Sequence, residues 1–115
     1  VAELLSVEIN STVRQAIEIM NRAGVSQLPV FERGNLVGSL SESVLFQKTM
    51  ETPDVMDLTV GALLEPPFPT VGMDEDIYEV VKLLKSAPAI LVRDGAKYRG
   101  IMTRFDVIEH LGTVQ

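Results

Sequence analysis

Thr103 and Asp106 are the two side chains whose types and spacing point most directly to ligand chemistry. They follow apolar Ile101 and Met102, where the pattern changes from strand to helix, so Thr103 is predicted at the N-cap and Asp106 at the third helical position. There the hydroxyl can accept a backbone N–H, and the carboxylate can complement the helix dipole. If the same groups face a cleft, the carboxylate can accept two hydrogen bonds from the vicinal diol of a ribose.

Capping alone explains such a helix start, but an internal repeat favours the binding interpretation. The segment Gly38–Ser41 recurs 62 residues later as Gly100–Thr103. An amphipathic helix, a short apolar strand and a glycine turn precede each copy. In the first copy Ser41 keeps the hydroxyl, whereas Val44 occupies the carboxylate position. A diol-binding site is therefore predicted to be intact once and degraded once.

Hydrophobic spacing and turn residues predict the elements that must position these side chains. Each copy is expected to form a strand, a helix, a two-stranded hairpin and a second helix. We expect Gly24 to end the first helix and Pro29 to mark a sheet edge or a strand start. Aligning Leu28–Phe31 with Ala89–Val92 makes the second copy three residues shorter between its helix and its strand. The predicted elements are strands at 4–7, 25–31 and 36–40, helices at about 13–23 and 41–50, a short helix or turn at 58–64, a strand at 70–71, a helix at 77–85, strands at 89–92 and up to 102, and a last helix that Thr103 caps.

Size and composition are those of an ordinary compact protein. The chain has 115 residues, of which 46% are hydrophobic and 23% charged. No apolar run approaches the roughly 18 residues of a spanning helix, and no signal peptide is evident, so the cytoplasm is the expected location. We expect domains at 1–50 and 66–115 joined by a linker at 51–65. Because the chain begins at Val1, we also expect it to be one part of a larger protein.

The residues needed for most catalytic chemistry are missing. The absence of cysteine excludes disulfides, thiolate nucleophiles and cysteine metal sites. The single histidine, His110, is expected to face carbonyls at the end of the last helix and not a metal. No catalytic triad, phosphate-binding loop or glycine-rich dinucleotide motif is present. The net charge of −6 and the scattered basic residues argue against nucleic-acid binding. Neither an enzyme nor a metal site is expected.

The two copies resemble a tandem pair of CBS domains, which is also called a Bateman module. The resemblance covers essentially the whole chain and rests on two Gly-hydrophobic-x-Ser/Thr-x-x-Asp/Asn patterns, each after a helix and a hairpin. Segments such as Gly24–Val30 and Pro66–Pro69 look similar to the C-terminal regulatory region of bacterial cystathionine β-synthases. Archaeal regulators that join a DNA-binding helix-turn-helix to a CBS pair are similar too. The resemblance implies an α/β (α+β) fold with two β-α-β-β-α repeats, related by a pseudo-twofold axis, and small sheets flanked by helices.

The resemblance also implies two ligand clefts, each built from both copies. In the first, Asp106 would bind the ribose and Thr103 would lie toward the 5′ substituent, while adenine would lie against the first copy's opening strand and the turn that follows its helix. Without the repeat, the same strand and turn would be interpreted as core and as an ordinary polar turn. The first cleft is expected to contain Asp106, Thr103, Leu4, Leu5, Val25, Ser26, Gln27, Leu28, Pro29 and Arg104. The second cleft, expected to be weaker because of Val44, would contain Ser41, Phe68, Pro69, Thr70, Ala87 and Ala89.

The ligands that the resemblance implies contain adenosine: AMP, ADP, ATP or S-adenosylmethionine, with no obligatory cofactor. An acidic chain with Arg104 as its chief cation near the cleft disfavours triphosphates, whereas similarity to cystathionine β-synthase favours S-adenosylmethionine. The leading hypothesis is a non-catalytic sensor that forms a homodimer through its helices and controls an effector domain, without contacting nucleic acid or a membrane. The competing hypothesis is a structural or dimerisation module with vestigial clefts, in which Thr103 and Asp106 only cap a helix.

Overall fold

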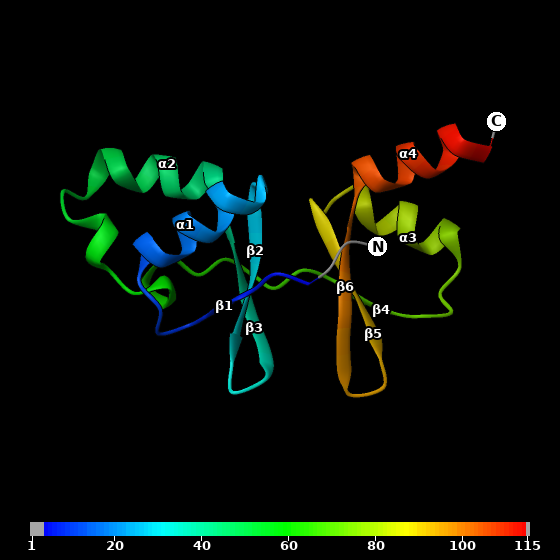
Figure 1. Ribbon diagram of the computed structural model, residues 1–115, viewed down its shortest axis with the longest axis horizontal. Helices are drawn as coiled ribbons and strands as arrows, with labels where there is room; N and C mark the ends of the chain where they lie inside the picture. Colours follow the sequence, from blue (N-terminus) through cyan, green and yellow to red (C-terminus); the bar gives the residue numbers. More distant parts are fainter. Residues whose placement is uncertain (1–3, 115) are drawn as a thin grey trace. The chain divides into compact units, whose positions relative to one another are not determined.

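The computed structural model describes residues 4–114, and it divides into two compact units. One unit runs from Leu5 to Pro67, and the other runs from Phe68 onward and includes Leu4. The first unit contains β1 (Val7–Glu8), α1 (Val13–Ala23), β2 (Gln27–Glu32), β3 (Asn35–Ser41), α2 (Glu42–Glu51) and two short 3-10 helices, η1 (Val55–Asp57) and η2 (Val60–Leu63). The second contains β4 (Thr70–Gly72), α3 (Ile77–Leu84), β5 (Ala89–Asp94), β6 (Lys97–Thr103) and α4 (Arg104–Val114). The predicted repeat of strand, helix, hairpin and helix is confirmed (Figure 1).

Each unit is built on a three-stranded sheet with the same topology. The orders are β1-β2-β3 and β4-β5-β6, so a parallel strand and an antiparallel strand flank each central strand. Gln27 pairs with Ser41 in the first hairpin, and Ala89 pairs with Thr103 in the second. Both members of one pair precede those of the other by 62 residues, which is the spacing predicted from the sequence. A register shift also recurs at the same place, after Val30 and after Val92.

Helix caps lie where the sequence predicts them. Thr12 accepts the Gln15 N–H, and the Gln15 side chain accepts the Thr12 N–H, which completes a capping box at the start of α1. Gly24 ends α1 with a φ of 69°, a left-handed conformation that glycine adopts without a Cβ penalty. Asp76 accepts the Tyr78 N–H and caps α3, so the predicted acidic helix start is confirmed.

Apolar side chains of the helices pack on one face of each sheet. In the first unit Val13, Ala16 and Met20 of α1 join the core, and the segment predicted as a linker adds three buried residues to it. In the second unit Val80 and Leu84 of α3 are buried, whereas Ile77 and Val81, which have the same helical spacing, are exposed. The residues that the linker segment contributes are Val55, Val60 and Leu63.

Three details of the predicted strands are wrong. The opening strand was expected over residues 4–7 but starts at Val7, because its pairing with β2 begins only at Val30. Pro29 was expected at an edge, yet β2 is the central strand. Its missing N–H is tolerated because it points to the side of β1 before β1 begins to pair. The helix-to-strand connection of the second copy is shorter by two residues and not three, since Val92 and not Leu91 is equivalent to Val30.

Candidate functional site

The start of α4 holds the hydroxyl and the carboxylate that the sequence singles out. The Thr103 N–H donates to Asp106 Oδ2 at 2.8 Å, and the Thr103 hydroxyl donates to the same oxygen at 3.2 Å. The Asp106 N–H lies 3.4 Å from Thr103 Oγ1, so the two side chains bond reciprocally. The capping interpretation of this helix start is therefore confirmed.

Capping leaves part of the Asp106 carboxylate for a ligand. Among residues 4–114, both side-chain hydrogen bonds that Asp106 accepts go to Oδ2, and none goes to Oδ1. Asp106 and Thr103 are half-buried, so solvent still reaches them. An ionised carboxylate offers about four lone-pair sites on its two oxygens. The cap and a hydrogen bond from a ligand hydroxyl are thus chemically compatible on this one side chain.

Arg104, the next residue, is held by another element. Its Nε donates to the Leu84 carbonyl oxygen at 2.6 Å, which satisfies a carbonyl at the end of α3. Arg104 also lines a cavity of about 220 Å³ in the second unit. A bond between residues 20 positions apart in sequence has no local signal, and sequence reasoning missed it. The cavity is lined by Val81, Leu84, Lys85, Arg104, Val107 and Ile108.

The start of α2 is the equivalent place in the first unit. Ser41 Oγ accepts the Val44 N–H at 3.3 Å and lies 3.2 Å from the Ser43 hydroxyl. Ser41 therefore caps α2 as Thr103 caps α4. Val44 is half-buried and supplies no acceptor, so the reciprocal half of the box is missing. This agrees with the expected loss of the carboxylate from the helix start itself.

The turn between α1 and β2 was predicted to contact adenine, and it is tied to α2. The Ser26 carbonyl oxygen accepts the Glu42 N–H at 2.9 Å, and the Ser26 hydroxyl donates to Gln27 Oε1 at 2.9 Å. The Ser26 side chain is exposed, and Gln27 is half-buried. Leu28 is fully buried in the core beneath α1, where its side chain supports the fold directly.

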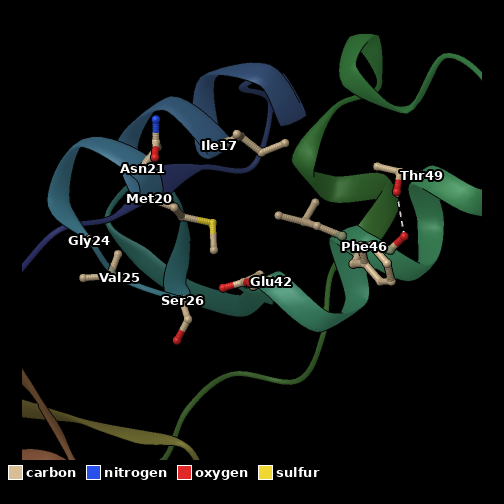
Figure 2. Close-up of a pocket in the computed structure, with 10 residues that line it drawn as sticks. Ile17, Met20, Asn21, Gly24, Val25, Ser26, Glu42, Phe46 and Thr49 are labelled. Atoms are coloured by element: carbon tan, nitrogen blue, oxygen red, sulfur yellow. Dashed lines mark hydrogen bonds between the residues drawn. The ribbon is translucent and has the colours of Figure 1, made fainter.

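A pocket of about 580 Å³ in the first unit brings this turn together with both helices (Figure 2). Val25 and Ser26 lie at one end of it, Met20 comes from α1, and Glu42 comes from the start of α2. Sequence reasoning did not single out α2 as a pocket wall. The signal was present in Phe46, an apolar residue of α2 that stays 67% exposed. The lining residues are Ile17, Met20, Asn21, Gly24, Val25, Ser26, Glu42, Leu45, Phe46 and Thr49.

The other predicted site residues have varied environments. Leu4 is half-buried and Leu5 is 38% exposed, and both precede the first strand. Ala89 is buried and pairs with Thr103 in the second sheet. Within a unit, then, the neighbours of each helix start come from the other predicted set. Pro29 and Phe68 are buried, Pro69 accepts the Leu91 N–H at 2.9 Å, Thr70 is exposed in β4, and Ala87 is half-buried after α3.

Two other kinds of feature were sought in residues 4–114. No group of histidine, aspartate and glutamate side chains there is arranged to hold a metal ion. None of the helices in that range is long and apolar enough to cross a bilayer. The side chain of His110, for which we predicted contacts to helix-end carbonyls, lies outside the side chains that the structure describes.

Comparison with known proteins follows from this repeated geometry. The sequence model of the CBS domain matches residues 1–49 and 60–113. The chain belongs to the CBS-domain family. The resemblance and the fold class predicted from the sequence are thereby confirmed, including the two small sheets flanked by helices.

Individual relatives support the CBS-pair fold. The uncharacterized protein MJ1232 of Methanocaldococcus jannaschii is 26% identical over 112 residues, which are 95% of this chain but 36% of that protein. A CBS domain-containing protein of unknown function from Bacillus anthracis superposes with a TM-score of 0.82 at 17% identity, covering 96% of this chain and 85% of the other. CBSX2, solved in complex with AMP, gives a TM-score of 0.77 at 24% identity, covering 96% and 89%. The chain thus spans about a third of the length of its curated relative.

Proposed function

We propose that this CBS pair is a regulatory module that binds an adenosine-containing ligand and passes the signal to an effector. The observation that carries the proposal is Asp106, whose Oδ2 completes the helix cap while Oδ1 accepts no bond within residues 4–114. That oxygen can accept a ribose hydroxyl without loss of the cap. The AMP complex of CBSX2 supports adenosine ligands for this fold.

The roles of the remaining residues follow the sequence-based expectation. We propose that Thr103 lies toward the 5′ substituent, and that backbone groups and apolar side chains of the turn at residues 25–29 bind adenine. The Ser26 carbonyl already accepts the Glu42 N–H. The turn therefore has fewer unused acceptors than its sequence suggests.

The identity of the ligand remains among AMP, ADP, ATP and S-adenosylmethionine. Arg104 is the cation closest in sequence to Thr103 and Asp106, and its Nε is bonded to the Leu84 carbonyl. A guanidinium anchored in this way is less free to follow a flexible triphosphate. This favours AMP or S-adenosylmethionine over ATP.

A signal needs a receiver, and we propose two. One is an effector domain in a longer parent chain, since the chain spans 36% of its curated relative. The other is a second copy of the module, bound through the helices. The ligand can bias either one only through different affinities for two arrangements.

The test is a thermal-shift titration of the purified protein with AMP, ATP and S-adenosylmethionine. A ligand that binds only the folded state raises the melting temperature, by an amount that grows with its concentration. We expect a saturable shift with at least one of the three. Asp106→Asn keeps an oxygen for the cap but removes the charge, so it should weaken binding about tenfold or more, since hydrogen bonds to a charged group contribute about 1.5–3 kcal/mol.

Asp106→Ala separates the sensor from the structural module. It should abolish the shift and also lower the free energy of unfolding by about 1 kcal/mol, because the cap is lost. If wild-type protein shows no shift with any of the three ligands, while Asp106→Ala is still destabilised, the helix start has only a capping role. The structural or dimerisation module would then be the better assignment.

A further inference from the structure

Glu65 carries a buried carboxylate oxygen that nothing in the structure satisfies. Its Oε2 has essentially no solvent-accessible surface and no hydrogen-bond partner. The residue as a whole is half-buried, so part of the side chain still reaches solvent. Burying a carboxylate oxygen without a donor is costly, and almost all buried polar atoms have a partner. An orphan acceptor at the end of the segment that connects the two repeats therefore needs an explanation.

The backbone around Glu65 is fixed on the free edge of β3. Its N–H donates to the Ser39 carbonyl at 2.9 Å, and the Ser39 N–H donates back at 3.0 Å. The Ser39 hydroxyl donates to the Pro66 carbonyl at 2.7 Å. A Cβ on Gly38 would lie 2.5 Å from Leu64 Cγ and 2.7 Å from the Glu65 carbonyl oxygen, so only glycine permits this contact. The carboxylate is therefore presented from a rigid support.

Sheet geometry places Glu65 on the same face of the sheet as Ser41. Residues opposite each other in an antiparallel pair project to the same face, and side chains two residues apart on one strand do so too. Ser39 faces Glu65, and Ser41 is two residues further along β3. Cβ atoms in such a diagonal relationship are about 7–8 Å apart. One small group can therefore contact both the Ser41 hydroxyl and the Glu65 carboxylate.

We propose that Glu65 supplies the carboxylate that the first repeat lacks at Val44, and that it accepts hydrogen bonds from the ribose hydroxyls of a second ligand molecule beside Ser41. This inference rests on the proposed adenosyl-ligand function and extends it to a second site. The first repeat then has the same two functional groups as Thr103 and Asp106, with its acceptor moved from the helix to the connecting segment. The first repeat is thus a working site despite Val44.

The test is isothermal titration calorimetry with AMP, ATP and S-adenosylmethionine in turn, on wild-type protein and on Asp106→Ala, Glu65→Gln and the double variant. We expect two binding events for wild type with at least one ligand. Asp106→Ala should keep the event that Glu65→Gln weakens about tenfold or more. The double variant should lose both. Glu32→Ala, which removes an exposed glutamate at the end of β2, is the matched control and should bind as wild type does.

The outcomes distinguish this inference from the function on which it rests. One event that depends on Asp106 and is unchanged in Glu65→Gln would overturn the second site and leave the proposed function intact. No event with any ligand in wild-type protein would overturn both. Glu65→Gln preserves the shape of the side chain and removes an uncompensated charge, so its melting temperature without ligand should equal or exceed that of wild type. A loss of folding in Glu65→Gln would assign the carboxylate a structural role and also overturn the second site.

Discussion

At the scale of single residues, one pair of side chains serves two purposes. Thr103 and Asp106 close the first turn of α4 through three hydrogen bonds, all of them local. Because the cap uses one carboxylate oxygen, the pattern of residues that starts a helix can also bind a ligand. The repeat suggested a binding role that a single copy could not, since capping alone accounts for each pattern.

Thr103→Ala tests how much the cap contributes to stability. The variant loses the acceptor for the Asp106 N–H but keeps the bond from the Thr103 backbone to Asp106 Oδ2. We expect the free energy of unfolding to fall by about 1 kcal/mol, measured by urea denaturation. Thr103→Ser keeps the hydroxyl and should remain close to wild type. Equal stability of the two variants would show that the hydroxyl does not cap α4.

At the scale of elements, the segment that leaves α2 is part of the first unit. It runs back along residues 9–13, where the Val60 N–H donates to the Ser11 carbonyl and the Val13 N–H donates to the Leu58 carbonyl. It then pairs with the free edge of β3 through Ser39. Covering that edge removes a row of unpaired backbone groups. Composition alone suggested a loop, because Pro53 and the short apolar stretch show no strand pattern.

Gly38→Ala tests this contact between the segment and β3. The added Cβ would lie against Leu64 and the Glu65 carbonyl, and neither can move without breaking the pairing with Ser39. We expect a loss of about 1–3 kcal/mol in the free energy of unfolding, as for other overpacked positions. Gly72→Ala is the control, because the only atom near its added Cβ is Asp74 Oδ1 at 3.2 Å. Similar losses in both variants would mean that the cost comes from replacing glycine in a strand.

At the scale of the whole molecule, the helices leave large apolar side chains in solvent. Phe46 and Met50 of α2 are 67% and 77% exposed, and Phe105 and Ile108 of α4 are 67% and 64% exposed. Apolar groups gathered in this way mark interaction surfaces more often than they mark free ones. This supports the proposal that a second copy covers the helices.

Phe46→Lys tests the proposed homodimer. We expect wild-type protein to elute as a dimer in size-exclusion chromatography with light scattering, and Phe46→Lys to shift toward the monomer at the same concentration. A buried lysine cannot be paired there without cost. Gln47→Lys, next to it on α2, adds the same charge at an exposed polar position and should leave the dimer unchanged. A monomeric wild type would exclude the homodimer.

Local sequence determined the repeat, the helices and their caps, because these depend on side chains within about four residues of one another. The 62-residue spacing, the capping role of Thr103 and the missing carboxylate at Val44 could all be deduced in this way. Tertiary structure decided the rest. The late start of β1 at Val7, the bond from Arg104 to Leu84 and the seat of Glu65 beside Ser39 each join residues about 20 or more positions apart. No local pattern encodes such pairings, since they depend on which strand edges and helix ends the folded chain leaves to be filled.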